Sequence, residues 1–164
     1  MNKRAIYPGT FDPITYGHLD LIKRGLLLFD EIIIAVAEMS QKQVLFTVEE
    51  RVNLIKEVTK EFQGLRVESF KGLVVEYARS KNIRIILRGL RMISDFEYEF
   101  QMALTNRKLA PEIETIFMMT SEKYSFISSR LIKEAVALGA DVSEFVPPPV
   151  YNALINKLKS GGKL

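Results

Sequence analysis

Cysteine is absent from the sequence, and so are long apolar runs. Without cysteine the chain can form neither disulfides nor thiolate metal sites, and its composition does not indicate a redox compartment. The longest apolar run, residues 32–37, is far shorter than the roughly 20 residues that span a bilayer. The first residues enter a strand pattern directly, with no apolar signal segment. We therefore expect a cytoplasmic protein with no membrane partner.

A marked excess of one charge is also missing. The chain has 23 Lys and Arg residues against 20 Asp and Glu residues, which gives a net charge of +3. The two signs are interleaved rather than gathered into a basic stripe, so we expect no nucleic-acid partner. Apolar residues make up 48% of the 164 positions, enough for one substantial core. We expect a single domain over residues 1–164, with 160–164 as a frayed tail.

Apolar runs with strand character alternate with amphipathic helical patterns along the chain. This alternation predicts an α/β fold, a three-layer αβα sandwich around a five-stranded, parallel, Rossmann-like sheet with further C-terminal helices. The first expected strand ends at Pro8-Gly9, and the others are residues 31–37, 65–70, 83–87 and 114–119.

Capping-box patterns predict where two of the helices begin. Thr47 is followed by Glu50, and Ser94 by Glu97, each at the spacing that satisfies free amides at a helix start. In the second of these helices, apolar residues at helical spacing predict a buried face, made of Phe96, Phe100, Ala103 and Leu104.

Histidine occurs once, at His18, directly after the first expected strand and its loop. A helix begins near Gly17-His18, and a strand, a tight loop and a helix N-terminus together favour anion binding. Gly9 and Gly17 would let the backbone approach a ligand closely. A lone histidine near a helix start is otherwise a surface residue or a satisfied core residue. The context of the loop favours a role at a phosphate.

The remaining candidates follow the other strands, whose carboxyl ends meet at one edge of a parallel sheet, where ligands bind. These are Lys42, residues 72–74, Arg88 to Arg91, and residues 124–130. Three of these four have a plainer explanation. Lys42 could be a solvated charge, the arginines could form salt bridges with Asp95, Glu97 or Glu99, and the serines could only cap a helix.

The stretch from Tyr7 to His18 carries a resemblance. Thr15-x-Gly-His18 resembles the (His/Thr)-x-Gly-His signature of the nucleotidyltransferase superfamily, and the surrounding dozen residues resemble the adenylyltransferase family of bacterial coenzyme A synthesis. The likeness covers nearly the whole chain. It implies that ATP and 4′-phosphopantetheine give 3′-dephospho-coenzyme A and pyrophosphate. It also implies Mg²⁺ carried with ATP, a homohexamer, and feedback inhibition by coenzyme A.

The resemblance also assigns roles to matching residues. Thr10, His18, Lys42 and Arg91 would carry catalysis, and Thr10, Lys42, Val74 and Arg88 would bind the acceptor. Residues 125–129 resemble the family's Ile-Ser-Ser motif, whereas Arg130 stands where some members carry Ser. No residue is expected to bind a metal directly. The ATP site would comprise Thr10, Phe11, His18, Gly89, Leu90, Arg91, Glu99, Tyr124, Ser125, Phe126, Ile127, Ser128, Ser129 and Arg130.

The mechanism implied is direct in-line attack on the α-phosphorus. A phosphate nucleophile is already ionised at pH 7, so no general base is required, and catalysis would consist of positioning and charge stabilisation. Two alternatives stay open at this point. One is a nucleotidyltransferase for nicotinate mononucleotide or a phosphorylated polyol, and the other is a non-catalytic ATP-binding module.

Overall fold

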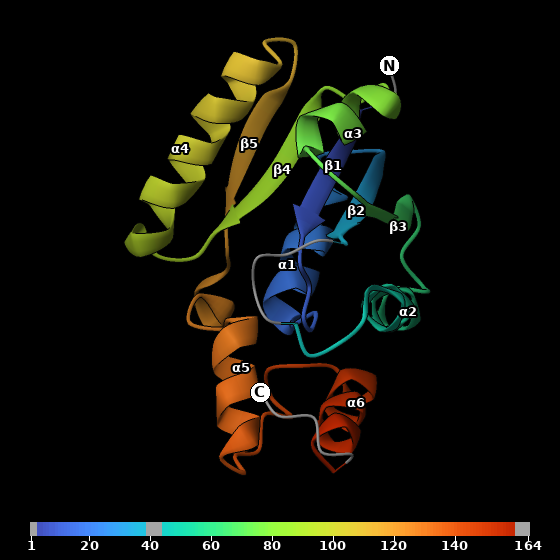
Figure 1. Ribbon diagram of the computed structural model, residues 1–164, viewed down its shortest axis with the longest axis vertical. Coiled ribbons are helices and arrows are strands. Elements are labelled where there is room, and N and C mark those ends of the chain that lie inside the picture. Colours follow the sequence, from blue (N-terminus) through green and yellow to red (C-terminus); the bar gives the residue numbers. More distant parts are fainter. Residues whose placement is uncertain (1–2, 39–43, 160–164) are drawn as a thin grey trace.

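The computed structural model describes residues 3–38 and 44–159, and its centre is a parallel sheet. All its strands run in the same direction, in the order β3-β2-β1-β4-β5. The expected α/β fold is confirmed, with three layers and C-terminal helices (Figure 1). The strands are β1 (Arg4–Gly9), β2 (Glu31–Ala37), β3 (Leu65–Phe70), β4 (Ile85–Leu90) and β5 (Glu114–Met119).

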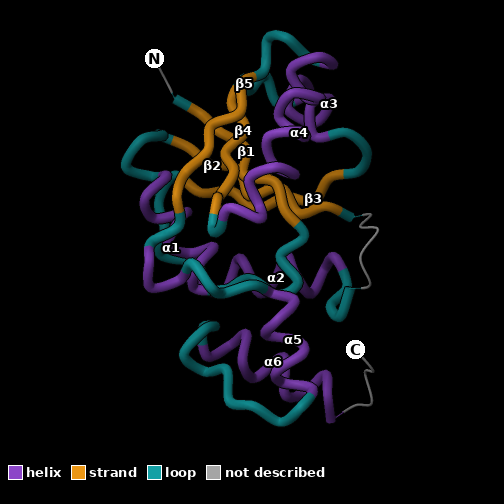
Figure 2. The backbone as a smooth tube through the Cα atoms, turned by 90° about the vertical axis from the view of Figure 1, so that its left-hand side faces the viewer, coloured by secondary structure: helices purple, strands orange, loops and turns teal. Residues whose placement is uncertain are grey.

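Two hydrophobic clusters lie on opposite faces of the sheet, because successive strand residues point to opposite sides. Ile32 and Ile34 of β2 join the cluster beneath α1 and α2, whereas Ile33 joins the cluster beneath α3. Figure 2 shows α3 on one side of the sheet and α1 with α2 on the other. The helices are α1 (Tyr16–Gly25), α2 (Val48–Val58), α3 (Val74–Ser80), α4 (Ile93–Leu109), α5 (Ser129–Ala137) and α6 (Pro148–Lys159).

The fourth strand differs from its expected bounds. It was expected over residues 83–87 with Arg88 to Arg91 following it, but β4 runs to Leu90. Gly89 and Leu90 continue the ladder with β5, opposite Met118 and Met119. Arg88 therefore belongs to the strand, where its pairing with Phe117 of β5 fixes its backbone.

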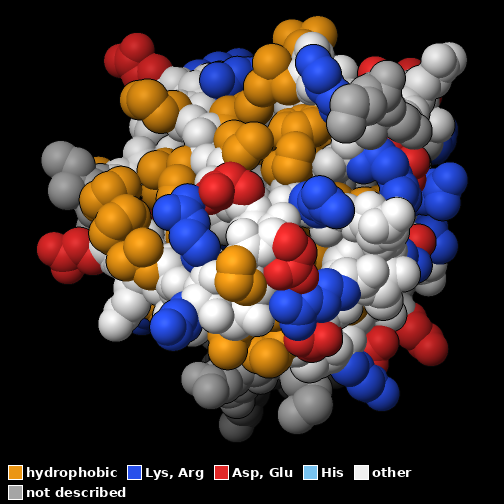
Figure 3. All heavy atoms as spheres, turned by 90° about the horizontal axis from the view of Figure 1, so that it is seen from above, with side chains coloured by type: hydrophobic (Ala, Val, Ile, Leu, Met, Phe, Trp, Pro, Cys, Tyr) orange, Lys and Arg blue, Asp and Glu red, His pale blue; other side chains and the backbone are white. Residues whose placement is uncertain are grey.

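Helix α4 contradicts two expectations. It begins at Ile93 with Met92 at its N-cap position, so the capping box expected at Ser94 and Glu97 is wrong. The apolar face expected to be buried is also wrong in this chain, since Phe96, Phe100 and Leu104 are 46–49% exposed. Glu99 is the one buried residue among the described side chains of α4. Hydrophobic side chains gather on the side of the molecule that carries α4 (Figure 3).

The carboxyl ends of the strands meet at one edge, and α5 and α6 lie beyond that edge (Figure 1). A short 3₁₀ turn, η1 (Glu122–Tyr124), leads from β5 towards α5. In the described part of the chain, no helix has the length and hydropathy needed to cross a membrane.

Candidate active site

His18 stands at the third position of α1 and closes a capping box with Thr15. The backbone N–H of Thr15 donates to Nδ1 of His18 at 3.0 Å, and the backbone N–H of His18 donates to the Thr15 hydroxyl at 3.4 Å. A backbone N–H can only donate, so Nδ1 is the acceptor and a neutral ring carries its proton on Nε2. The local fold thus fixes the tautomer and leaves the Nε2–H donor for a ligand.

The imidazole of His18 is neutral at pH 7. Burial, followed by the charges of Arg91 and Arg88, lowers its pKa from 6.5 to about 3. The ring packs beside Phe11, with 5.0 Å between the ring centroids, and Tyr7 lies 6.4 Å away by the same measure. Burial also raises the pKa of Tyr7 to about 12, so its phenol stays protonated. The site therefore offers two uncharged donors near the charges of two arginines.

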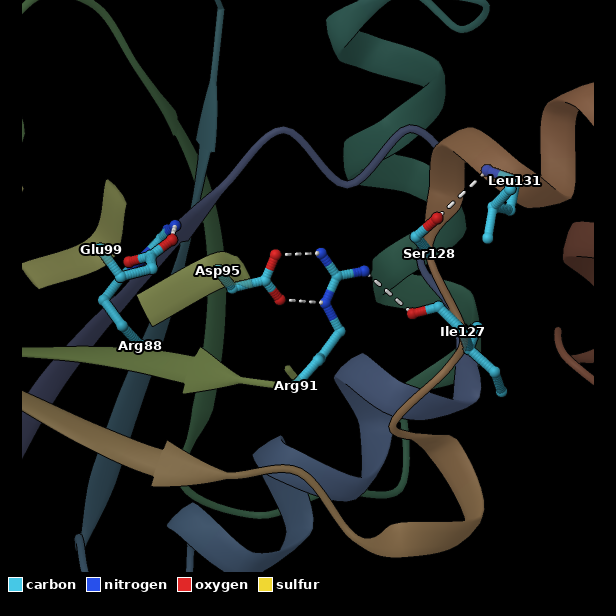
Figure 4. Close-up of polar contacts among 7 residues, drawn as sticks. All are labelled: Arg88, Arg91, Asp95, Glu99, Ile127, Ser128 and Leu131. Carbon is cyan, nitrogen blue, oxygen red and sulfur yellow. Dashed lines mark hydrogen bonds and ion pairs between the residues drawn. The ribbon is translucent and has the colours of Figure 1, made fainter. Parts of the chain in front are cut away.

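Arg88 is held by a carboxylate and by a carbonyl. Its Nε donates to Glu99 Oε2 at 2.8 Å, its Nη2 donates to Glu99 Oε1, and its Nη1 donates to the carbonyl of Pro8 at 2.6 Å. Figure 4 shows this pair beside Arg91. A guanidinium has five N–H donors, so two remain after these three bonds. The salt bridge offered as the plainer explanation is present, yet it leaves Arg88 capacity for a ligand.

Arg91 joins the turn after β4 to the stretch before α5. Its Nε donates to Asp95 Oδ2 at 3.1 Å, and its Nη1 donates to the carbonyl of Ile127 at 3.0 Å (Figure 4). The salt bridge expected as an alternative is present here too. The guanidinium therefore connects two of the loops that were expected to meet at this edge.

The serines before α5 have structural partners. Ser128 caps the helix, since its hydroxyl accepts the N–H of Leu131 at 3.1 Å, and the Ser129 hydroxyl donates to the carbonyl of Pro13 at 2.7 Å. The cap offered as the plainer explanation is confirmed. The first turn of a helix leaves amides without intrahelical acceptors, here those of Ser129 and Arg130. These amides form an anion-binding end close to the loop after β1.

Other expected ATP-site residues surround this stretch. Tyr124 stacks on Tyr16, and Ile127 is buried, whereas Phe126 is exposed and its ring edge meets Phe145. The exposed Arg130 side chain pairs with Glu134 within α5.

Glycine and phenylalanine shape the loop after β1 itself. A Cβ at Gly9 would lie 2.8 Å from the Phe11 ring, so the absence of a side chain there admits the ring that packs against His18. Phe11 is 3% exposed. The adjacent Thr10 is half-buried, and its carbonyl accepts a hydrogen bond from Arg51 at 2.7 Å. Gly89 has a packing role as well, because its Cβ would lie 2.6 Å from Leu21.

Two expected site residues are not joined to this cluster. Lys42 lies outside the described residues. Val74 begins α3 and packs on the hydrophobic cluster beneath that helix, whereas Tyr7 and Phe11 beside His18 belong to the cluster on the other face.

Sequence reasoning missed two buried charged residues at the loop, Arg51 and Asp12. Arg51 is 1% exposed and donates to the carbonyls of Thr10, Ala37 and Phe46. Asp12 is 3% exposed, and its carboxylate pairs with Lys133. Asp12 stood within the motif stretch and Arg51 directly after a capping box, but nothing in the sequence indicated that either would be enclosed.

Comparison with known proteins adds a family to this geometry. Residues 6–135 match the cytidylyltransferase-like family model. A phosphopantetheine adenylyltransferase of Caldanaerobacter subterraneus subsp. tengcongensis is 56% identical over 94% of this chain and 97% of its own. A phosphopantetheine adenylyltransferase of Azoarcus sp. is 53% identical over 95% of this chain and 96% of its own. A nicotinic acid mononucleotide adenylyltransferase of Plasmodium falciparum has a TM-score of 0.72 at 15% identity, covering 99% of both chains, a likeness of fold.

Proposed function

The chain belongs to the phosphopantetheine adenylyltransferase family, and we propose that the cluster around His18 catalyses its reaction. The reaction transfers the adenylyl group of ATP to 4′-phosphopantetheine, giving 3′-dephospho-coenzyme A and pyrophosphate in coenzyme A biosynthesis. The observation that carries the proposal is the neutral His18 ring. Its Nδ1 accepts the N–H of Thr15, so its Nε2–H is available to a ligand, and the charges of Arg91 and Arg88 act on the ring.

The chemistry is direct in-line displacement. An oxygen of the acceptor phosphate forms a bond to the α-phosphorus of ATP, while the bond from that phosphorus to the bridging oxygen breaks. Pyrophosphate leaves with the electron pair. The nucleophile is ionised at pH 7, so the site needs no general base and acts by positioning and charge stabilisation.

His18 and Arg91 act on the charge that develops at the α-phosphate. His18 donates its Nε2–H to a non-bridging oxygen. Because the pKa of the ring is low, the imidazole is an uncharged donor near pH 7. A donor fixed before the reaction stabilises the transition state without reorganisation. Arg91 adds positive charge from a position held by Asp95 and Ile127. Thr10 completes the catalytic set from the loop after β1.

Arg88 binds the phosphate of the acceptor through the two N–H donors that Glu99 and Pro8 leave available. Glu99 orients the guanidinium and balances its charge. Lys42 and Val74 are assigned to the acceptor through the family likeness, Lys42 at the phosphate and Val74 at the pantetheine arm.

ATP is bound along the carboxyl edge of the sheet. The β- and γ-phosphates meet the amides at the N-terminus of α5, which suits anions through its dipole and its free N–H groups. The adenosine end meets the segment at the end of β4. The residues assigned to ATP are Thr10, Phe11, His18, Gly89, Leu90, Arg91, Glu99, Tyr124, Ser125, Phe126, Ile127, Ser128, Ser129 and Arg130.

Magnesium is proposed to arrive with ATP, held by its phosphates and by water. Among the described residues, no three acidic or histidine side chains gather into a group that could hold a metal ion. Coenzyme A is proposed as an inhibitor, since it shares the pantetheine arm with the acceptor, and the cytoplasm is proposed as the location.

We also propose a homohexamer. The support within this chain is the apolar face of α4, where Phe96 and Phe100 stack on each other with 5.5 Å between ring centroids while both are 46% exposed. An exposed apolar face of this kind marks a protein contact more often than a solvated surface.

Pyrophosphate release across a panel of acceptors tests the function. We expect release with 4′-phosphopantetheine, and little or none with nicotinate mononucleotide or a phosphorylated polyol. Lys81→Met, which removes an ion pair with Glu68 at the far end of α3, serves as a matched active control. Preference for another acceptor would identify a different nucleotidyltransferase. ATP binding without release for any acceptor would identify a binding module.

A further inference from the structure

A largely buried ion pair joins the loop after β1 to α5. Lys133 Nζ lies 2.7 Å from Oδ2 of Asp12, and the two side chains are 15% and 4% exposed. The same carboxylate accepts the backbone N–H of Leu45 at 2.8 Å and that of Phe46 at 2.9 Å. Asp12 therefore ties together three segments that are distant in sequence, namely its own loop, the segment before α2, and α5.

A second set of bonds holds the same loop on either side of Asp12 in the sequence. Arg51 of α2 donates to the carbonyl of Thr10 at 2.7 Å and to that of Phe46 at 3.1 Å. The Ser129 hydroxyl donates to Pro13 on the other side of Asp12. Side chains of α2 and α5 thus hold the loop at Thr10, Asp12 and Pro13.

Stability alone does not account for a buried ion pair. Removing two charges from water costs on the order of several kcal/mol per ion in proteins. A protein with well-packed apolar residues in place of such a pair is often at least as stable. An ion pair whose carboxylate accepts two further N–H groups does, however, fix direction and distance. The pair connects the loop that leads to His18, where the α-phosphate is assigned, with α5, where the β- and γ-phosphates are assigned.

We propose that Asp12 and Lys133 form a positioning pair that sets the N-terminus of α5 at the correct distance from His18. This rests on the proposed function, in which His18 acts on the α-phosphate and α5 binds the β- and γ-phosphates. One ATP molecule has to reach both, and its covalent geometry fixes how far apart they can be. A misplacement of about 1 Å can cost about 10²-fold in rate.

Kinetics of three variants test the pair. Lys133→Met and Asp12→Asn should each lower kcat by about 10- to 10²-fold and raise the KM for ATP, with little change in the KM for phosphopantetheine. The double variant should lose clearly less than the product of the two single fold-losses, because both single variants break the Asp12–Lys133 pair. Lys133→Arg keeps the charge and should recover most of the activity. Lys81→Met is the matched control for loss of an ion pair.

Binding measurements separate this inference from the proposed function. In calorimetry, Lys133→Met should weaken ATP binding by at least about tenfold while AMP binding changes little, because only ATP spans both elements. This result is expected even if the wild-type chain released no pyrophosphate, an outcome that would overturn the function alone. Equal losses for ATP and AMP would overturn the pair. So would variants that melt at lower temperature with unchanged kcat and KM.

Discussion

Replacing His18 with glutamine or with alanine separates the two bonds that the ring can make. Nδ1 accepts the N–H of Thr15 and so helps to cap α1, while Nε2–H is available for the α-phosphate. Glutamine at the third helical position can accept the capping bond but does not present the ring donor. Alanine loses both.

The sizes of the two losses follow from these contacts. A donor acting mainly in the transition state contributes roughly 3–4 kcal/mol, or about 10²–10³ in kcat. Loss of a helix cap costs about 1 kcal/mol, which lowers Tm by roughly 2–4 °C in a chain of this size. In both variants kcat should therefore fall by about 10²- to 10³-fold. Only in His18→Ala should Tm also fall by roughly 2–4 °C.

The assay combines kcat from pyrophosphate release at saturating substrates, Tm from calorimetry, and the Kd of ATP. ATP affinity should fall only modestly, because the bond strengthens as charge develops. If folded His18→Gln kept wild-type kcat, the proposed role of the ring would be refuted. A fall in Tm that accounted for all lost activity in both variants would show a purely structural role.

The remaining predictions concern the arginines, the protonation of His18, and assembly. Arg88→Ala should chiefly raise the KM for phosphopantetheine and Arg91→Ala should chiefly lower kcat, and identical kinetic profiles would contradict the separation. Nitrogen NMR of the single imidazole, in untagged protein, should show the Nε2–H form unchanged from pH 8 to pH 5, because its pKa is about 3; a midpoint near 6.5 would contradict this. Because the pKa of folded His18 is about 3 and the ordinary value is 6.5, between these pH values the unfolded chain binds a proton that the folded chain does not. The free energy of unfolding should therefore fall by up to about 1.4 kcal/mol for each pH unit as the pH is lowered from 6.5 towards 3. In denaturant titrations, His18→Gln should lack this pH-dependent contribution. An identical pH dependence in the wild type and His18→Gln would rule out a contribution from His18. Sedimentation should show an oligomer that Phe100→Glu dissociates, whereas an 18.8 kDa wild-type monomer at micromolar concentration would end the proposal.

Local patterns predicted most of the sheet and one of the two helix starts expected from capping boxes. The run from Glu31 to Ala37 is apolar on both faces because β2 is central and covered on both sides, so its bounds could be read directly. The capping box at Thr47 and Glu50 is present as expected. These features depend on neighbours in sequence, which is why the sequence alone suffices for them.

Features that depend on partners distant in sequence were less accessible. Arg88 and Gly89 read as a loop, yet pairing with β5 continues the strand through them. The apolar stripe of α4 was correctly identified as a stripe, but helical spacing does not say what covers it, and in this chain it is exposed.

The same distinction applies to the candidate site. The motif around His18 is contiguous and could be recognised, whereas the tautomer of the ring depends on the donor it meets in the folded loop. The arginines could have formed either salt bridges or phosphate contacts, and the structure shows that a salt bridge leaves donors available. Asp12 and Lys133 are 121 positions apart, so no local pattern could join them.

Transfer of labelled oxygen tests the central claim most directly. The protein is incubated with ATP, Mg²⁺ and 4′-phosphopantetheine whose phosphate carries ¹⁸O. The masses of the products are then measured by mass spectrometry. In-line attack by the acceptor phosphate predicts 3′-dephospho-coenzyme A that retains all the label, together with unlabelled pyrophosphate. Free AMP in place of dephospho-coenzyme A, or label in the pyrophosphate, would contradict the mechanism, and the absence of any product would contradict the function.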